Sequence, residues 1–263
     1  MSTRLIIQRL LVTLAAALPL LATSLAQADT IRVRADRWYP YNGDPGSERP
    51  GYVIEMLQRV LGAAGHQIDY QVVPWQRALH ETGKGKADCV VGAYPEEAPH
   101  LLFSKVPVGT DTDVFISAAD DTWVYDGVAS LAGKRFGAVA GYSYDTSLDA
   151  LIASKPDGMV MIAGHDGLLR GLRMIDSGRL DLFVESRTVF LANVYLAGTR
   201  QKYRIAGETE QESPMFVACT PGNPHAAAWL ALLDTGIAAM RKNGELATLL
   251  RRYGLDDWES ARR

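Results

Sequence analysis

Short alternating and amphipathic segments follow one another along most of the chain. Residues 30–35 alternate in polarity as a strand does, and residues 52–64 carry apolar side chains at helical spacing. A second strand is predicted at residues 68–73, a second helix at 75–82 and a third strand at 88–92. This order of strand, helix, strand, helix and strand predicts a mostly parallel sheet with helices on both faces.

The same arrangement recurs in the second half of the chain. An arginine, a glycine eight residues later and an aspartate after three more precede an apolar strand twice, at Arg77, Gly85 and Asp88 and again at Arg170, Gly178 and Asp181. A strand at residues 134–140, a helix at 147–154 and a strand at 158–163 come before the second copy. The repeat predicts two similar α/β lobes, with a ligand crevice beyond the carboxyl ends of their strands.

The amino-terminal segment has the pattern of a secretory signal. Arg4 and Arg9 precede a largely apolar run over residues 10–22, and Ala26 and Ala28 place small residues at the positions that a signal peptidase reads. We expect residues 1–28 to be removed by cleavage after Ala28 and the mature protein to be periplasmic. No later apolar stretch approaches the roughly 20 residues that a spanning helix needs.

Composition excludes several classes of function. With 48% hydrophobic residues, 22% charged residues and a formal net charge of −3, the chain resembles an ordinary soluble globular protein. It has no basic stripe, so we expect no nucleic-acid partner. The five histidines are scattered and no glycine motif for nucleotides occurs, so we expect no metal and no cofactor.

Two cysteines, Cys89 and Cys219, lie in strand-like apolar runs. Two buried thiols are the simpler interpretation, because free cysteine packs as a small hydrophobic residue. A disulfide is the alternative, since an exported protein folds where disulfides form. The residues leave both possibilities open.

The segments that follow the predicted strands supply the candidate ligand-binding residues. Most are aromatic or acidic, although single tyrosines can equally pack between lobes and single glutamates can be solvated. The candidates are Trp38, Tyr39, Tyr41, Trp75, Arg77, Gly92, Tyr94, Glu97, Gly141, Tyr142, Ser143, Glu185 and Ser186.

Several motifs together resemble the type II periplasmic solute-binding proteins of family 3, the amino-acid receptors of ABC transporters. The resemblance spans residues 30–258 and rests on the order of Gly51-Tyr-Val-Ile-Glu-Met56, Trp75-Gln-Arg-Ala-Leu79, Gly85-Lys-Ala-Asp88, Phe103-Ser-Lys-Val-Pro107, Gly178-Arg-Leu-Asp181 and Met240-Arg-Lys-Asn-Gly-Glu-Leu246. It implies a monomer that closes two lobes over a small-molecule solute and serves an inner-membrane ABC permease or a sensor.

The resemblance also implies the domain boundaries. Lobe 1 would comprise residues 29–108 and 212–263, and lobe 2 residues 109–211. The chain would cross between them near 107–110 and 208–213.

The chain departs from this family at the ligand clamp. The arginine that binds the ligand carboxylate is replaced by Glu97, and the aspartate that binds the ligand ammonium is replaced by Ser186, next to Glu185. Aromatic faces with carboxylates favour an organic cation or amine. Arg37 and Arg77 would instead suit an anionic group, so the residues leave the sign of the ligand's charge open.

Catalysis is the alternative function. Cyclohexadienyl dehydratases resemble these receptors and place an acidic residue in the cleft, which would make Glu185 a general acid. Their dicarboxylate substrate needs cationic partners, which Glu97 opposes. We therefore expect no catalytic residues and a receptor that binds a small polar solute, either an amine or a molecule related to amino acids.

Overall fold

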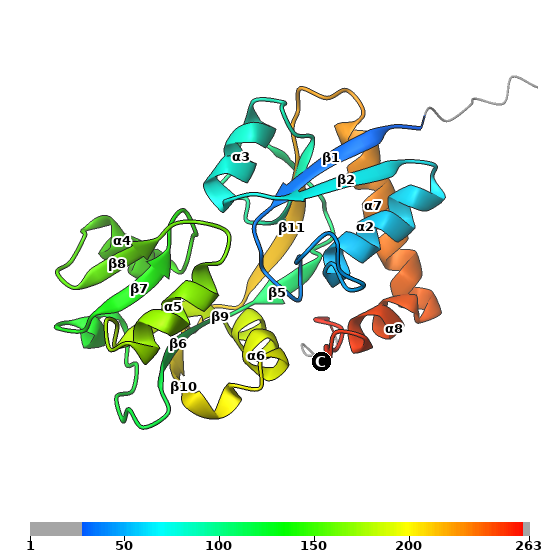
Figure 1. Cartoon of the computed structure of the whole chain (residues 1–263). Helices are drawn as coiled ribbons and strands as arrows, with labels where there is room; N and C mark the ends of the chain where they lie inside the picture. Colours follow the sequence, from blue (N-terminus) through cyan, green and yellow to red (C-terminus); the bar gives the residue numbers. More distant parts are fainter. Residues whose placement is uncertain (1–27, 260–263) are drawn as a thin grey trace, which may run out of the picture.

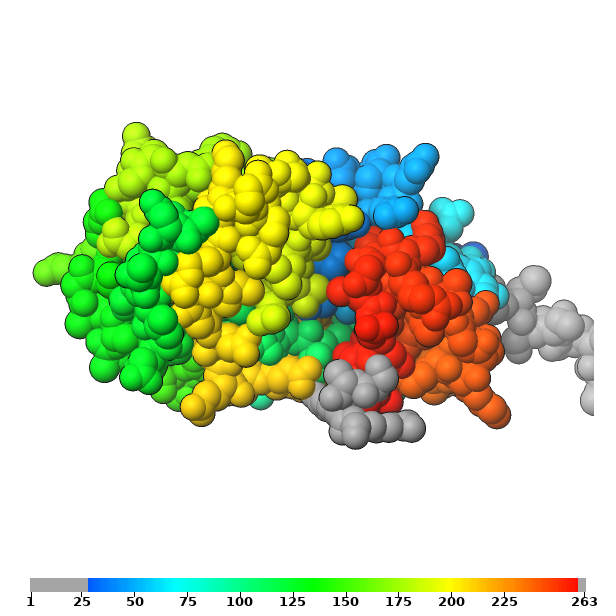
Figure 2. Space-filling model, turned by 90° about the horizontal axis from the view of Figure 1, so that it is seen from below, coloured from blue at the N-terminus to red at the C-terminus, as the bar shows by residue number. Residues whose placement is uncertain are grey.

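Two lobes, each built on its own β-sheet, make up the computed structural model (Figure 1). The structure describes residues 28–259, so the expected signal segment lies outside the described residues except for Ala28. Seen from below, the second lobe (green to yellow) and the first lobe (blue, orange and red) lie side by side (Figure 2). Mixed, mostly parallel α/β lobes are the fold class that the sequence predicts.

The first sheet contains three parallel strands that share one direction, in the order β2-β1-β3. Strand β11 pairs with β3 in the antiparallel direction, β4 follows at the edge, and β5 pairs with the beginning of β11. The strands are β1 (Thr30–Ala35), β2 (Gln67–Val72), β3 (Cys89–Ala93), β4 (Leu102–Phe103), β5 (Gly109–Asp111) and β11 (Ser213–Cys219).

The second sheet has the order β10-β6-β9-β7-β8. Its strands β7, β8 and β9 are parallel and correspond to the first three strands of lobe 1, whereas β6 is antiparallel to both of its neighbours. The strands are β6 (Asp113–Ala118), β7 (Phe136–Val139), β8 (Met159–Ile162), β9 (Leu182–Ser186) and β10 (Tyr203–Glu208). Sequence periodicity did not indicate β6 or β10.

Helices cover both faces of each sheet because neighbouring strand residues point to opposite sides. In β3, Val91 joins the core formed with α2 and α7, whereas Val90 joins the cluster formed with α3. In β9, Phe183 packs with α5 and α6, and Val184 packs with α4. The helices are α2 (Tyr52–Ala63), α3 (Trp75–Gly83), α4 (Thr146–Ala153), α5 (Gly167–Asp176), α6 (Arg187–Leu196), α7 (Ala226–Asn243) and α8 (Glu245–Arg251), with short 3₁₀ turns at Val128–Leu131 and Arg200–Lys202.

The repeated aspartate has the same structural role in both lobes. Asp88 accepts hydrogen bonds from the backbone N–H of Arg32 on β1, at 2.8 Å, and from its guanidinium. Asp181 does the same for Arg135, the residue before β7, with a backbone bond of 2.8 Å. Each aspartate therefore fixes the start of its lobe's third strand to the start of its first, which explains why the spacing recurs.

Two segments connect the sheets. Strand β5 pairs with β11 of the first sheet, and β6 of the second sheet begins two residues later at Asp113. By strand pairing, residues 109–111 therefore belong with the first sheet rather than with lobe 2, where the sequence interpretation put them. The return segment runs from the end of β10 to the beginning of β11.

Cys89 and Cys219 form a disulfide. The two residues lie directly opposite each other on the antiparallel strands β3 and β11, with their Cα atoms 4.0 Å apart. The interpretation as two buried thiols is therefore wrong, because cross-strand register, which the sequence does not reveal, brings the two residues together. The disulfide joins the first sheet's last strand to its central strand across 130 residues of sequence.

No helix within residues 28–259 is long and apolar enough to cross a bilayer.

Removing the disulfide should lower the stability of the fold without changing its topology. We expect the double variant Cys89→Ala, Cys219→Ala to lose about 2–5 kcal/mol of unfolding free energy, because the cross-link restricts a long loop in the unfolded chain. Guanidinium unfolding with and without dithiothreitol measures the loss. The reductant should destabilise the wild type and leave the double variant unchanged; a wild type indifferent to reductant would contradict the prediction.

Candidate functional site

A small cavity lies between the lobes, at the ends of strands from both sheets. Its walls come from the segments after β1, β3 and β7, the start of α3 and the first connection between the lobes. Parallel strands direct their carboxyl ends toward this crevice, as the repeat predicts. The lining residues are Asp36, Trp38, Trp75, Val91, Gly92, Tyr94, Glu97, Asp111, Asp113, Tyr142 and Ser143.

The free volume of the cavity is only about 20 Å³. That is room for roughly one water molecule. The space between the lobes is filled by the side chains of Trp38, Trp75 and Tyr142, so a solute of several atoms requires a movement of the lobes or of these side chains.

Apart from bonds to the connecting segment at Asp111, three hydrogen bonds join the lobes within the described residues. The indole Nε1 of Trp38 donates to Oε1 of Glu185 at 3.0 Å, and the hydroxyl of Tyr142 donates to the carboxylate of Asp36. At the edge of the contact, the side chain of Asn193 donates to the backbone oxygen of Tyr39 at 3.1 Å. The lobes are thus bridged by the same side chains that surround the cavity.

Close backbone approach accompanies these bonds. Gly141 has φ +87°, and a Cβ atom there would lie 2.2 Å from Cγ of Gln76 in the opposite lobe. Only glycine fits both this conformation and this contact. Gly141 therefore contributes to the contact between lobes.

Glu97 is held toward the cavity by two donors. Its Oε1 accepts from the backbone N–H of Tyr94 at 2.8 Å, and its Oε2 accepts from Nε1 of Trp75 at 3.1 Å. Burial raises the pKa of the Glu97 carboxyl to about 7, although these two hydrogen bonds favour the ionised form and lower the pKa. Glu97 thus places a carboxyl group at the position where the resemblance to the receptor family implies an arginine.

Four further carboxyl groups surround the cavity or lie behind its wall. Burial raises the pKa of Asp36 to about 6, of Asp111 to about 7 and of Glu185 to about 8. Burial, together with the charges of Asp111 and Glu185, raises the pKa of Asp113 well above its usual range. Among the described residues that line the cavity, none has a basic side chain. The site therefore has an excess of buried acid groups.

Seven of the thirteen candidate residues line the cavity: Trp38, Trp75, Gly92, Tyr94, Glu97, Tyr142 and Ser143. Gly92 has φ +81° and leaves room for the ring of Trp38, whose edge lies 3.4 Å from the place of a Cβ atom. Ser143 precedes α4 but does not cap it; Asp145 caps this helix by accepting from the backbone N–H groups of Ser147 and Leu148.

Three of the other candidates, Glu185, Ser186 and Tyr41, support the cavity from behind. Glu185 is 2% exposed and binds Trp38, and Ser186 caps α6 while its hydroxyl donates to Asp111. Tyr41 lies beneath Trp38, with its hydroxyl 2.9 Å from the backbone oxygen of Thr110. The ring of Tyr39 packs near Tyr253, outside the cavity, and Gly141 touches Gln76.

Arg77 does not reach the cavity. Its guanidinium pairs with Glu81, one turn further along α3, at 2.7 Å, and its side chain is 65% exposed. Arg37 is also outside the cavity and lies 3.9 Å from Asp44. Neither arginine replaces the missing carboxylate clamp.

Sequence reasoning missed Val91, Asp111 and Asp113 and did not select Asp36 from its segment. Asp36 follows β1 directly, which is a usable signal for a crevice position. Asp111 and Asp113 lie where the chain passes from one sheet to the other, and alternation puts both side chains on the same side. The pattern Asp-Thr-Asp at a hinge was the available signal for this pair.

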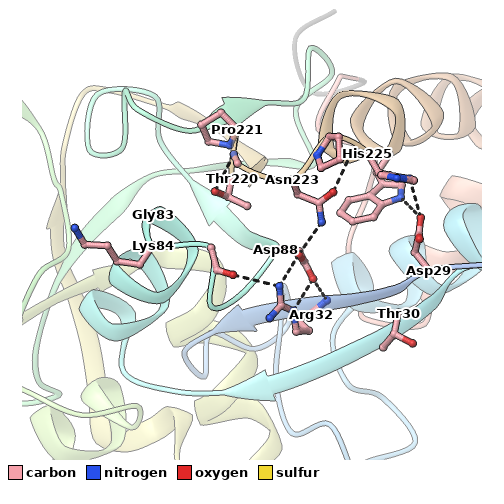
Figure 3. Close-up of a pocket in the computed structure, with 14 residues that line it drawn as sticks. Asp29, Thr30, Arg32, Gly83, Lys84, Asp88, Thr220, Pro221, Asn223 and His225 are labelled. Atoms are coloured by element: carbon pink, nitrogen blue, oxygen red, sulfur yellow. Dashed lines mark hydrogen bonds and ion pairs between the residues drawn. The ribbon is translucent and has the colours of Figure 1, made fainter.

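A wider hollow lies at the opposite end of the first sheet, where β1 and β3 begin (Figure 3). Its volume is about 840 Å³. Most of its charged groups already have partners: Arg32 pairs with Asp88 and His225 with Asp29, and Asn223 and Trp229 donate to the same two carboxylates. Because these partners occupy its carboxylates and the hollow lies away from the crevice, we favour the cavity between the lobes as the solute site.

No group of three or more histidine, cysteine, aspartate or glutamate residues suited to hold a metal ion occurs in the described part of the chain.

Comparisons with known proteins agree with this geometry. The model of the bacterial extracellular solute-binding proteins, family 3, matches residues 31–256. The probable amino-acid-binding protein YxeM of Bacillus subtilis (strain 168) is 23% identical over 222 residues, which cover 83% of this chain and 81% of YxeM.

Solved structures share the fold at low identity. An ancestral arginine-binding protein bound to arginine has a TM-score of 0.71 at 19% identity, covering 87% of this chain and 99% of that one. A histidine kinase sensor domain with similarity to periplasmic binding proteins has a TM-score of 0.70 at 18% identity, covering 85% and 95%. The chain therefore belongs to family 3 of the bacterial extracellular solute-binding proteins.

Proposed function

We propose that this solute-binding protein captures a small organic cation between its two lobes. The ligand is an amine, and its binding does not require a carboxylate group on the ligand. The observation that carries the proposal is the cavity wall itself. Asp36, Glu97, Asp111 and Asp113 line it together with aromatic rings, and no lining residue within the described range is basic. Buried carboxyl groups without cationic partners are unfavourable in their ionised form, and a bound ammonium group removes that cost.

The aromatic walls suit the same ligand. Trp38, Trp75 and Tyr142 surround the cavity, and the faces of such rings attract an ammonium group, most strongly where water is excluded. An α-amino acid held in the way usual for this family would place its carboxylate near Glu97. Repulsion between the two carboxylates disfavours that ligand.

The approach to the cavity is acidic as well. An open groove of about 640 Å³ shares Tyr94, Asp111, Asp113 and Ser143 with the cavity wall and adds Glu96 and Asp149. The described residues that line this groove include no lysine, arginine or histidine. A groove with charge of one sign raises the local concentration of cations and accelerates their association.

The cellular role that we propose follows from family membership. Signal cleavage after Ala28 would release a monomeric periplasmic receptor, which delivers its solute to an ABC importer or to a sensor. The fold shared with an amino acid ABC transporter substrate-binding protein of Streptococcus pneumoniae favours import, and the fold shared with a sensor domain favours signalling. Nucleic acid plays no part in this proposal.

The dehydratase alternative has less support. Glu185 does not line the cavity, and its Oε1 is engaged by Trp38 and by the N–H of Ser186. A dicarboxylate substrate would also meet acidic groups on every side. An enzyme would consume its ligand, whereas the proposed receptor returns it unchanged.

Thermal unfolding in the presence of candidate solutes tests the proposal. For residues 29–263 we expect stabilisation by 1,4-diaminobutane or related amines, about 2.7 kcal/mol at a hundred times the dissociation constant. Amino acids, dicarboxylates, sugars and prephenate should have no effect. Stabilisation only by α-amino acids or dicarboxylates would overturn the cationic assignment.

Replacing Glu97 identifies the site. Glu97→Gln should weaken binding of 1,4-diaminobutane by about tenfold to a hundredfold, because a bond to a charged partner contributes roughly 1.5–3 kcal/mol. Glu96→Gln is the matched control, since it removes the same charge from the adjacent exposed residue. Titration calorimetry of both variants measures the difference; equal losses would mean that only net charge matters.

Binding should depend on pH with a definite sign. Burial raises the pKa of Asp36 to about 6 and of Glu97 to about 7, and a bound ammonium favours the ionised carboxylates. Binding therefore lowers both pKa values and releases protons. The affinity for 1,4-diaminobutane should rise from about pH 5.5 to about pH 8, by at most about tenfold per pH unit for each proton released.

Calorimetry in two buffers of different ionisation enthalpy counts the protons exchanged. Glu97→Gln should reduce the number of protons released, whereas Glu96→Gln should not. Proton uptake, with an affinity for 1,4-diaminobutane that falls as pH rises, would contradict the prediction.

A further inference from the structure

Tyr142 reaches across the interlobe cavity from lobe 2 to a carboxylate of lobe 1. Its hydroxyl donates to Oδ2 of Asp36, and its ring meets the ring of Trp38 edge-on at a centroid distance of 6.2 Å. The ring also packs against the cluster that contains Trp75. One side chain thus lines the cavity from the lobe 2 side and occupies a buried acceptor of lobe 1.

Asp36 could also form an ion pair with a cationic solute through its carboxylate. It is 5% exposed, it lines the cavity, and the Tyr142 hydroxyl is the one side-chain donor that bonds to its carboxylate among the described residues. An ammonium group near Asp36 would gain an ion pair in a poorly hydrated site, which is stronger than the bond from a neutral hydroxyl. The ammonium group and the Tyr142 hydroxyl therefore compete for the Asp36 carboxylate.

Tyr142 is more exposed than the two tryptophans of the cavity. Trp38 is 7% exposed and donates to Glu185, and Trp75 is 5% exposed and donates to Glu97. Tyr142 is only partly buried and follows Gly141, which has φ +87°. Since the cavity has about 20 Å³ of free volume, a solute of several atoms requires movement of the lobes or of a side chain, and movement of Tyr142 also frees the carboxylate of Asp36.

We propose that Tyr142 is a specificity-determining residue whose side chain competes with the solute for Asp36 and for the space beside Trp38. This inference rests on the cationic solute proposed above. A cation binds when its ion pair with Asp36 is stronger than the Tyr142–Asp36 hydrogen bond that it replaces. A neutral solute of the same size forms no such ion pair and does not bind. The same bond links the lobes directly, so it also favours closure when no solute is bound.

Removing the hydroxyl alone tests the competition. At pH 8 we expect Tyr142→Phe to bind 1,4-diaminobutane at least about threefold more tightly than the wild type, because Asp36 no longer has a competing donor. Tyr144→Phe is the matched control: it removes a tyrosine hydroxyl two residues away that contacts the backbone of Val139 rather than Asp36. Its affinity should stay within about twofold of the wild type. Unchanged or weaker binding by Tyr142→Phe would overturn the inference.

Removing the ring tests the use of space. Tyr142→Ala should accept benzylamine, a bulkier cation, better than the wild type does relative to 1,4-diaminobutane. An unchanged ratio of the two affinities would contradict the assignment of specificity to this side chain. Circular dichroism confirms that each variant remains folded.

A measurement without any solute separates this inference from the proposed function. Small-angle scattering should give a larger radius of gyration for Tyr142→Phe than for the wild type and Tyr144→Phe, because one direct bond between the lobes is lost. If the wild type binds no amine, the cationic assignment fails while the scattering result still tests the bond. If the wild type binds amines and Tyr142→Phe changes neither affinity nor scattering, the inference about Tyr142 alone fails.

Discussion

Burial of acid groups between two lobes is the constraint on which the site depends. Burial destabilises the ionised form of four carboxyl groups, because no basic side chain is present among the described residues of the cavity wall. They are Asp36, Glu97, Asp111 and Glu185. Protons or a cationic ligand can relieve that cost. The hydrogen bonds that Trp38, Trp75 and Tyr142 donate to Glu185, Glu97 and Asp36 relieve it in part.

The fold creates this constraint by repetition. In each lobe, an aspartate fixes the third strand to the first, through Arg32 in one case and Arg135 in the other. Parallel strands then end at one edge of each sheet, and the two edges face each other. The loops at these edges vary without disturbing the sheets, so a chain of this family can keep the architecture with Glu97 at the position where the resemblance implies an arginine.

Closure and selectivity are linked through the same side chains. Trp38–Glu185 and Tyr142–Asp36 join the lobes, and three of these four residues also line the cavity. A solute therefore binds only when its contacts exceed those that the lobes make with each other. On the proposed function, such an arrangement sets a threshold on affinity and disfavours small neutral molecules, because they form no ion pair with an ionised carboxylate.

The sequence by itself determined the two-lobed α/β architecture, the crevice position of Trp38, Trp75, Tyr94, Glu97 and Tyr142, and the absence of an arginine at the clamp. The architecture and the crevice positions follow from local periodicity and from a repeat, which are properties of neighbouring residues, whereas the missing arginine follows only from the resemblance to the family. Only the tertiary structure decided that Arg77 faces outward to Glu81, that Cys89 meets Cys219, and that Asp111 and Asp113 join the cavity. Those outcomes depend on strand register and on the course of the chain between the sheets, which bring together residues that are distant in sequence and leave no periodic signal.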